Sequence, residues 1–574
     1  MVTWSDVPLW RAAHIETVQD DASAARKAAR EQVQELEAHY SRIASQGLAI
    51  DAMRQALSRV QDELDHAVNA ISAYMLACAE AIDGVRVVEA KVRSALEISE
   101  EIGCTIYDDG SVSIPYIDLS DAVRYGKADV LLGKSNELHM CIADALSIAR
   151  KVDEELRRKL QELAEDRFEQ NGPKEGRHSA SPGLPDDADE SWSPSEVSAW
   201  WGALTDEERQ ACIERDPLKY GNLDGIDMAS RDKANRMALY GYDTGGNASI
   251  RLGSTGLLQQ AQDKFDQAQA AYDDCVGAHG LFSDEAMALK AERDRAGRDL
   301  ADLQKIDERL RKGAGEDGEP VSLLALDTSG EQVKAAVAVG DVDHAQHVAN
   351  FTPGMGTNVR DSLDNYVDVA DRMRENTVEK AKVERSDVAV VAWLNYDAPT
   401  DITKTWDTDV AGTEKARAGA DRLAGFLTGV RSWRDEQGGS LHLTSVSHSY
   451  GSTTAGFAMR QMGEGVVDDH IYLGSPGSAA YTVGALGVDP SHVWVSAVPE
   501  GDMVQGMGPD VTFGRNPEQL EGIQHLSGDA TGAQGYDPQP SSPVANHSSY
   551  FAPPKPGEEN EVLNDVCRVL GGAK

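Results

Sequence analysis

A change of pattern near Val321 constrains the fold of this chain more than any other feature. Beyond it, short runs rich in β-branched residues alternate with longer stretches of helical periodicity. Strands that alternate with helices in this way form a mostly parallel sheet with helices on both faces. The runs that we expect to be strands are 322–326, 333–339, 347–352, 388–395, 441–447, 470–474 and 492–498. The sequence therefore predicts an α/β fold between residues 320 and 574.

The first hundred residues have a helical pattern instead. An apolar stripe with steps of three and four runs from Leu57 to Val85, which predicts a long helix with one buried face. A preceding helix is expected at about residues 15–43, with Gln46 and Gly47 marking the turn between the two. Two antiparallel helices in a bundle are the simplest interpretation, and a groove that binds a partner is the alternative.

Local signals divide the rest of the N-terminal half. Asp109-Gly110 lies between apolar runs and predicts a small hairpin, which a helix at about 119–169 follows. Ser193-Pro194 begins a capping-box pattern and predicts the start of a helix. Residues 256–312 are expected to form two helices that break near 277–280. We therefore predict a helical module, a linker rich in Gly, Pro, Ser and Asp, a second helical segment and an α/β domain, at residues 1–169, 170–192, 193–319 and 320–574.

The charge balance excludes several classes of partner. Lys and Arg number 55 and Asp and Glu 96, so the formal net charge is −41. Because phosphates must be met by cations, nucleic acid and anionic membrane surfaces are not expected as main partners. No apolar run approaches the ~20 residues of a membrane span, and residues 1–10 lack the regions of a secretory signal. We expect a cytoplasmic protein, or one exported without a conventional signal peptide.

The cysteines indicate neither a disulfide framework nor a metal site. They are scattered without the short Cys/His spacings that metal sites use, and reduced, mostly buried thiols are the expected state. The six positions are Cys78, Cys104, Cys141, Cys212, Cys275 and Cys567.

The segment 441–456 is the part of the chain most indicative of chemistry. It has the pattern of a strand, a sharp turn at Ser449 and a helix of small residues. Such a turn holds a serine in strained backbone at the tip of a strand, with its hydroxyl exposed. Ser447 and Gly451 occupy the small positions around it, so the pattern is S-x-S-x-G instead of G-x-S-x-G. Ser449 is therefore the candidate nucleophile, and an ordinary strand–helix turn is the alternative.

A serine nucleophile needs a base, and the base needs an acid to orient it. In a fold of this class the three follow in the order serine, acid, histidine. Asp502 follows the strand predicted at 492–498, and His547 lies just before the last predicted helix. Asp502 and His547 are the candidate acid and base, and His525 is the rival base.

Three other residues compete for these roles. Glu500 is a rival acid close to Asp502, and Asp397 could serve only if the acid had moved to an earlier strand. Ser475 is a rival nucleophile. However, Pro476 follows it and would remove the backbone N–H that an oxyanion requires.

An oxyanion hole needs two backbone N–H groups near the nucleophile. The first is expected from Tyr450, the residue after Ser449. The second is expected from the glycine-rich loop at 353–357, with Met355 or Gly356 as the donor. A plain turn at the end of a strand is the alternative for that loop.

The C-terminal half resembles a family of actinobacterial α/β hydrolases formerly labelled as a domain of unknown function. The resemblance covers about residues 190–574, including the upstream run that begins at Trp200-Trp201. It implies an α/β-hydrolase fold and a serine hydrolase with Ser449, Asp502 and His547 as its triad. No metal or organic cofactor is implied. The matching motifs are Pro353-Gly-Met-Gly-Thr357, Trp393-Leu-Asn-Tyr-Asp-Ala-Pro399, Ser447-His-Ser-Tyr-Gly-Ser452, Gly474-Ser-Pro-Gly477, Glu500-Gly-Asp502 and His547-Ser-Ser-Tyr-Phe551.

The N-terminal hairpin is similar, more loosely, to the WXG-type helical hairpins of type VII secretion substrates. Ser45-Gln46-Gly47 stands where W-x-G would be, and small or apolar residues follow it at Ala49, Ala52 and Leu57. The tryptophan of the motif is absent. This resemblance implies a helical partner or the secretion machinery as a binding partner of residues 1–169.

Two functions from different classes follow. The first is a serine hydrolase of the esterase or lipase type, which acts on a small-molecule or lipid ester through an acyl-enzyme. The second is an interaction protein, in which the helical module binds a partner or self-assembles and the hydrolase domain is an inactive scaffold.

Overall fold

The structure is a computed structural model that describes residues 2–41, 48–113, 128–164, 187–189, 191–241, 255–315, 317–400 and 409–573. The chain divides into two compact units, one made of residues 1–118 and 138–211 and the other of residues 119–137 and 212–574. Residues 170–186 of the predicted linker lie outside the described residues. The predicted bounds 1–169, 193–319 and 320–574 stay predictions.

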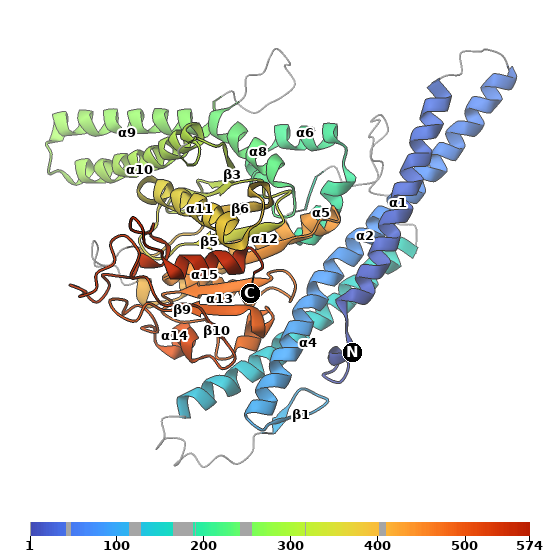
Figure 1. Ribbon diagram of the computed structural model, residues 1–574. Helices are drawn as coiled ribbons and strands as arrows, with labels where there is room; N and C mark the ends of the chain where they lie inside the picture. The colour runs from blue at the N-terminus through green and yellow to red at the C-terminus, as the bar shows by residue number, and fades with distance from the viewer. Residues whose placement is uncertain are drawn as a thin grey trace. The chain divides into compact units, whose positions relative to one another are not determined.

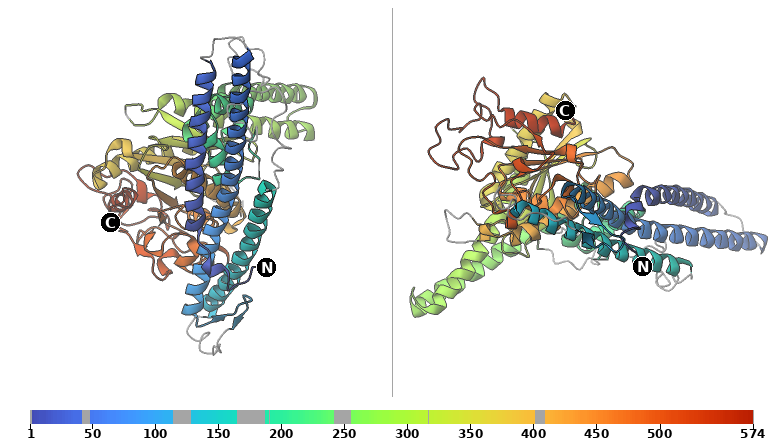
Figure 2. Two further views of the ribbon diagram at one scale, coloured as in Figure 1. Left: turned by 90° about the vertical axis from the view of Figure 1, so that its right-hand side faces the viewer. Right: turned by 90° about the horizontal axis from the view of Figure 1, so that it is seen from below.

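Long helices build the first unit. Helices α1 (Ala12–Ser41) and α2 (Leu48–Glu101) lie side by side and antiparallel (Figures 1 and 2), as the sequence predicted. The turn between them, with Gln46 and Gly47, falls outside the described residues. α4 (Ala128–Ala164) shares a hydrophobic core with α2. Its residues Leu138, Cys141 and Ala145 are buried in that core together with residues of α2.

The apolar stripe of α2 is buried along only part of its length. Val68, Met75, Cys78, Ile82 and Val85 are buried, which confirms the predicted bundle core for that part of the helix. The same stripe is partly or fully exposed at positions 57, 60 and 64.

Two local signals of this unit formed as predicted. Strands β1 (Thr105–Ile106) and β2 (Val112–Ser113) pair antiparallel, and Gly110 in their turn has a φ of +84°, a region that glycine enters without strain. Helix α5 (Pro194–Ala203) begins with the expected capping box. The Ser193 hydroxyl accepts a hydrogen bond from the Glu196 N–H, and the Glu196 carboxylate accepts one from the Ser193 N–H.

An eight-stranded sheet forms the centre of the second unit, in the order β10-β9-β8-β7-β5-β6-β4-β3. The strands from β10 to β6 pair in parallel, whereas β4 is antiparallel to both β3 and β6. All seven predicted strands are present, so the predicted α/β class is confirmed; β10 was not predicted. Their bounds are β3 Val321–Asp327, β4 Lys334–Val339, β5 His347–Thr352, β6 Val388–Leu394, β7 His442–His448, β8 Asp469–Leu473, β9 Val493–Ser496 and β10 Gln524–His525.

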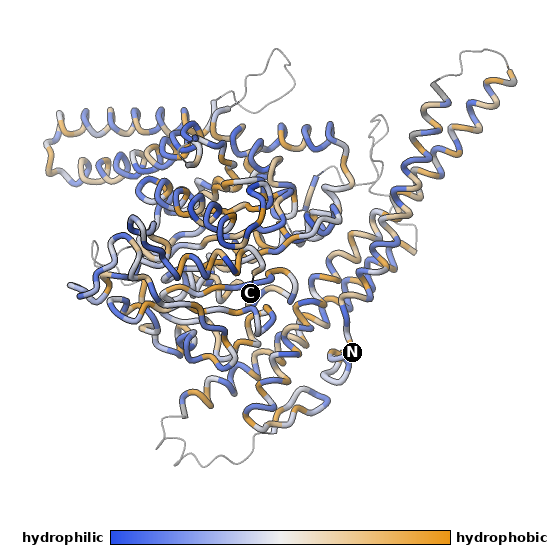
Figure 3. The backbone as a smooth tube through the Cα atoms, in the orientation of Figure 1, coloured by the Kyte–Doolittle hydropathy of each residue, from blue (hydrophilic) through white to orange (hydrophobic). Residues whose placement is uncertain are grey.

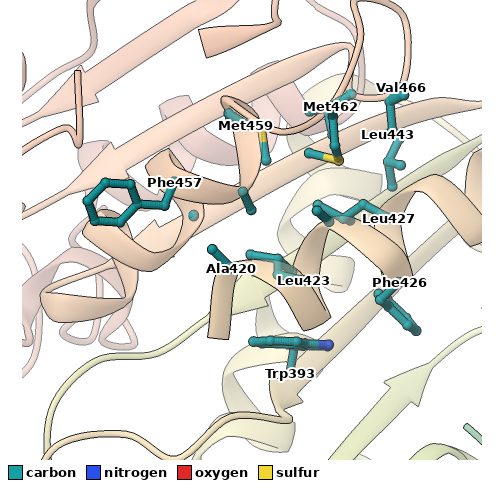
Figure 4. Packing of buried hydrophobic residues seen from close by; sticks show 14 of the residues in the cluster. Trp393, Ala420, Leu423, Phe426, Leu427, Leu443, Phe457, Met459, Met462 and Val466 are labelled. Carbon is teal, nitrogen blue, oxygen red and sulfur yellow. The ribbon is translucent and has the colours of Figure 1, made fainter. Parts of the chain in front are cut away.

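Both faces of this sheet are covered, which is why its central strands are apolar throughout. Every residue of β6 is buried, and its side chains alternate between two cores. Ala389, Val391 and Trp393 face the core that α12 and α13 cover, and Figure 4 shows Trp393 close to Leu423 of α12. Val390 and Ala392 face the core formed with α11 and α15. The sheet is therefore a rigid base for its loops.

The helices of the second unit from α7 onward pack around this sheet or extend from it. α9 and α10 form the predicted helical pair, which breaks at Gly280, and they lie side by side in Figures 1 and 2. The bounds are α6 Asp206–Arg215, α7 Pro217–Tyr220, α8 Met228–Tyr240, α9 Leu257–His279, α10 Asp284–Lys312, α11 Val359–Ala381, α12 Glu414–Glu436, α13 Tyr450–Met459, α14 Asp510–Phe513 and α15 Glu561–Leu570.

The long helices are amphipathic. Hydrophilic and hydrophobic segments alternate along α1, α2, α9 and α10 (Figure 3), as expected for helices that bury one face. In the part of the chain that the structure describes, no helix is both long enough and apolar enough to cross a membrane. The six cysteines, all within the described residues, form no disulfide bonds, and five of them are buried.

Candidate active site

Ser449 occupies a strained turn between a central strand and a helix. It follows β7, precedes α13, and has φ +58° and ψ −136°, a conformation that a residue with a Cβ rarely adopts. Its N–H donates to the carbonyl oxygen of Leu473 in β8 at 3.0 Å. Only 7% of Ser449 is exposed. The turn therefore has the backbone strain and the location at a strand tip that a nucleophile elbow requires.

Close packing around the turn explains its small residues. A Cβ added to Gly451 would lie 2.4 Å from the carbonyl oxygen of Pro353, so the helix can pass this loop only with glycine there. Ser447 has a side chain but is accommodated, because its hydroxyl donates to the carbonyl oxygen of Ile471 at 2.9 Å. Serine can therefore replace the first glycine of the G-x-S-x-G pattern here, because its buried hydroxyl has a hydrogen-bond acceptor.

The loop after β5 lies directly against Ser449. A Cβ on Gly354 would be 2.5 Å from the Ser449 Cβ and 2.8 Å from its Oγ. The loop is held by Tyr396, whose hydroxyl donates to the Pro353 carbonyl at 2.7 Å, and by the Thr357 hydroxyl, which donates to the Gly354 carbonyl at 2.7 Å. The loop after β5 and the turn at Ser449 are therefore packed so closely that no side chain larger than that of glycine fits at position 354 without a shift.

The two candidate donors in this loop differ. The Gly356 N–H donates to the carbonyl oxygen of Pro399 at 2.8 Å, so it already has an acceptor. Within the described residues, the Met355 N–H has none. Of the two residues named from the sequence, Met355 is thus the one whose N–H is available to a ligand in this structure.

Asp502 and His547 form a buried pair. The Nδ1 of His547 lies 2.8 Å from the Oδ1 of Asp502, whose side chain is fully buried. Burial by itself raises the pKa of the Asp502 carboxyl. Hydrogen bonds from His547 and Tyr550 outweigh it and hold that pKa below its usual value. Asp502 is therefore a stable acceptor that orients the imidazole.

Tyr550 completes the surroundings of Asp502, and the sequence analysis did not assign it a role. Its hydroxyl donates to the Oδ2 of Asp502 and accepts the N–H of Val498 at 3.2 Å. The pKa of Tyr550 is raised well above its ordinary value, mainly by burial and also by the neighbouring Asp502 carboxylate. The phenol therefore keeps its proton and acts as a donor. The only sequence signal was its position three residues after His547, in the 3-10 turn Ser549–Phe551.

His448 ties the loop of His547 to the elbow. Its Nε2 lies 2.7 Å from the carbonyl oxygen of His547, and the two rings are 4.5 Å apart. Burial, helped by the proximity of His547, lowers the pKa of His448 to about 3. The ring is therefore neutral, and since a carbonyl only accepts, its Nε2 must carry the donated proton. The base candidate is anchored to the residue that precedes Ser449.

Ser449 and His547 both lie beyond the carboxyl ends of the parallel strands β7 and β8. No hydrogen bond joins their side chains. The Nε2 of His547 is buried and has no partner among the described residues. A Cβ on Gly474, which follows the Leu473 that Ser449 contacts, would lie 2.7 Å from the Asp502 Oδ2 and 3.2 Å from the His547 Cε1. Hydrogen bonds of this kind are often long in an enzyme without substrate.

The rival residues have other surroundings. His525 is exposed on the edge strand β10, and Glu500 is exposed. Asp397 lies 3.2 Å from the Lys334 Nζ, and the buried Ser475 donates its hydroxyl to the Gly477 carbonyl at 3.0 Å. In the described chain, none of them forms a hydrogen bond or an ion pair with Asp502 or His547.

Comparison with known proteins supports this view of the C-terminal half. A family model described as alpha/beta hydrolase matches residues 328–512. The uncharacterized protein Rv0963c of Mycobacterium tuberculosis is 33% identical over 241 residues, which are 40% of this chain and 83% of that protein. The uncharacterized protein Mb0988c of Mycobacterium bovis matches to the same extent. The chain belongs to the alpha/beta hydrolase family.

A longer relative shares more of this alpha/beta hydrolase. The uncharacterized protein Rv2079 of Mycobacterium tuberculosis is 30% identical over 309 residues, which are 53% of this chain but 42% of that protein. The chain thus matches less than half the length of this relative. The family match includes Ser449 and Asp502 and ends before His547. Family membership leaves both the activity and the substrate of this chain open.

Proposed function

We propose that this alpha/beta hydrolase is a serine hydrolase of carboxylic esters, with Ser449 as nucleophile, His547 as base and Asp502 as the acid that orients it. The observation that carries the proposal is the strained backbone of Ser449 at the tip of β7. Such strain costs of order 1–3 kcal/mol and persists where it positions a reactive group. The buried pair of His547 and Asp502 supports it from the same edge of the sheet.

In the proposed reaction, the Ser449 Oγ attacks the ester carbonyl carbon while the Nε2 of His547 takes the hydroxyl proton. The tetrahedral intermediate collapses, the C–O bond to the alcohol breaks, and His547 returns the proton to the departing oxygen. A water molecule, deprotonated by His547, then attacks the acyl-enzyme. The bond between the acyl carbon and the Ser449 Oγ breaks, His547 returns the proton to that oxygen, and the carboxylic acid leaves. Asp502 keeps the imidazole in the tautomer whose Nε2 can accept a proton.

The oxyanion of both intermediates would be held by two backbone N–H groups. Tyr450 follows the nucleophile at the first turn of α13, and Met355 lies in the loop that touches Ser449. Loss of one such donor typically costs 10²–10³ in kcat. The described chain groups no three metal-binding side chains into an ion site, and each step of this reaction uses only the chain, the ester and water.

An activated-serine label tests the proposal. A fluorophosphonate should modify the wild-type chain at Ser449, located by peptide mass mapping, and Ser449→Ala should abolish both labelling and hydrolysis of p-nitrophenyl acetate. Ser475→Ala is the matched control, because Ser475 also lies just after a strand of the sheet, β8. The Ser475→Ala variant should still be labelled at Ser449. Labelling at Ser475, or full turnover by a folded Ser449→Ala variant, would contradict the assignment.

An interaction role for residues 1–169 is a second proposal, with a helical partner or secretion machinery bound to α2. Three exposed apolar side chains of α2 favour it, since Leu48, Met53 and Val60 are 90%, 45% and 45% exposed. Cross-linking of the full chain in its native cells should capture a partner. Met53→Gln with Val60→Gln should prevent capture while fluorophosphonate labelling persists. If the wild type and the double variant captured the partner equally, this role would be contradicted.

A further inference from the structure

Exposed apolar side chains are confined to one place in the α/β part of the chain. Among the described residues from 320 to 573, the large apolar side chains that are exposed are Met503, Met507, Val511 and Val544, at 60%, 64%, 88% and 51%. Single exposed apolar residues are common, but four of them restricted to two loops need an explanation. We call these four residues the apolar rim.

The apolar rim belongs to the loops that hold the candidate acid and base. Met503 directly follows Asp502, and the His547 N–H donates to the Val544 carbonyl at 3.2 Å. The two loops are joined, because the Met503 N–H donates to the Pro543 carbonyl at 2.8 Å. The two loops therefore lie next to each other beside the pair.

The rim also adjoins the nucleophile elbow. Phe513, two residues after Val511 in the short helix α14, packs edge-on against the ring of Tyr450, with 6.2 Å between ring centres. The loop between Met507 and α14 is fastened to the end of β8, because the Gly508 N–H donates to the Pro476 carbonyl at 2.9 Å. The segment that carries Met507 and Val511 thus packs, through Phe513, against the residue that follows Ser449.

The charges around the rim limit what can bind there. Besides the buried Asp502, residues 499–514 and 537–547 include three carboxylates and no Lys or Arg, and Arg515 directly follows the first of these segments. An anionic ligand or an anionic membrane would be repelled by this surface. An uncharged aliphatic chain has no such penalty and would cover exposed apolar area. The same carboxylates would favour release of the acid product, which is an anion at neutral pH.

We propose that the apolar rim binds the acyl chain of the substrate, and that this hydrolase prefers uncharged esters with an aliphatic acyl chain of medium length. The inference rests on the proposed function, since it assigns the substrate class of the same site. Full burial of one methylene group corresponds to about fourfold in affinity. On an open surface about half of that area is covered, so about twofold per methylene is expected.

The experiment measures kcat/KM of the full chain for p-nitrophenyl acetate, butyrate, hexanoate and octanoate, each below the concentration at which it aggregates. The expected result is a rise of about twofold per methylene, or roughly 60-fold from acetate to octanoate. Met507→Gln and Val511→Thr keep the shape of the side chain and remove its apolar character. Each should lower the octanoate-to-acetate ratio about three- to fivefold.

Matched controls separate this effect from a general change. Met287→Gln and Val18→Thr make the same replacements at apolar positions that are 52% and 42% exposed in other parts of the chain. They should leave the octanoate-to-acetate ratio as in the wild type. An equal change of that ratio in the rim variants and the controls would overturn the proposal.

Other outcomes are equally decisive. Hydrolysis of acetate with a flat chain-length profile would overturn the inference and leave the proposed function standing. Absence of hydrolysis and of fluorophosphonate labelling at Ser449 would defeat the proposed function itself. A rate that rises only when the ester aggregates would mean that the rim contacts a lipid surface and not a single chain, and would overturn the proposal.

Discussion

Single residues near the elbow act through contacts of one or two atoms. Gly354 is the clearest case, because a Cβ added to it would lie 2.5 Å from the Ser449 Cβ and leave no space for a further atom. Tyr550 and His547 each take one oxygen of the Asp502 carboxylate. The carboxylate is thereby held in one orientation while it holds the imidazole. Small changes at these positions should therefore affect turnover more than stability.

Gly354→Ala should reduce kcat/KM for p-nitrophenyl acetate by about 10²-fold. The new methyl group would lie 2.5 Å from the Ser449 Cβ, so either loop or nucleophile must move, and a displacement of about 1 Å costs on this order. Gly277→Ala in α9 is the control, since its Cβ would meet nothing within 4 Å. Steady-state kinetics and circular dichroism check the prediction. Wild-type kinetics in Gly354→Ala would show that Ser449 is not the nucleophile.

Tyr550→Phe should lower kcat about tenfold with KM nearly unchanged. The variant loses the hydroxyl that donates to Asp502, and a hydrogen bond to a charged group contributes about 1.5–3 kcal/mol. Tyr472→Phe also removes a buried hydroxyl, one that donates to the Ser478 carbonyl at 3.0 Å, and it should leave kcat within about twofold. Equal losses of kcat in both variants would mean that Tyr550 acts only through stability.

At the scale of one strand, β8 carries a buried group that makes the fold sensitive to acid. Both ring nitrogens of His470 are buried without a partner in the described residues. Burial lowers its pKa from 6.5 to about 3. Between these pH values the unfolded chain binds a proton that the folded chain does not. The free energy of unfolding therefore falls by about 1.4 kcal/mol per pH unit as the pH drops.

His470→Leu should remove that contribution. Relative to pH 7, the wild type at pH 5 should lose about 2 kcal/mol more stability than the variant, measured from urea unfolding curves at both pH values. His525→Gln replaces an exposed histidine of the neighbouring sheet edge and should follow the wild type. An identical pH dependence of wild type and His470→Leu would contradict the assignment of a neutral, buried ring.

At the scale of the whole molecule, the net charge affects how charged small molecules approach the chain. A net charge of −41 produces a field that repels anions and leaves neutral molecules unaffected. At low salt this field extends well beyond the surface, because the Debye length is about 30 Å at 0.01 M and about 10 Å at 0.1 M ionic strength. The proposed preference for uncharged esters should therefore depend on salt.

Raising NaCl from 10 to 300 mM should increase kcat/KM severalfold for an ester with an anionic acyl group, such as a succinate monoester. The same change should leave p-nitrophenyl butyrate within about 1.5-fold, because screening alters only the interaction of the field with a charged substrate. Initial rates at substrate concentrations below KM give both values. An equal salt effect on the two esters would contradict the prediction. It would indicate that salt changes the protein itself and not the rate at which the charged ester associates with it.

Much of the architecture was decided by residues close together in the chain. The seven predicted strands were found because runs of β-branched residues are local properties of the sequence. β6 is apolar throughout because both of its faces are covered. The capping box at Ser193 formed because its partners are three residues apart. The order of Ser449, Asp502 and His547 along the chain was also enough to nominate them together, although their roles stay proposals.

Only the tertiary structure decided the contacts between residues distant in sequence. It paired His547 with Asp502, gave Asp502 a second donor in Tyr550, and engaged the Gly356 N–H with Pro399, so that of the two named donors Met355 is the available one. It also added β10 and made β3 and β4 antiparallel. Sequence periodicity reports which face of an element is buried, whereas the partner on that face depends on how strands are ordered in the sheet and where their loops meet.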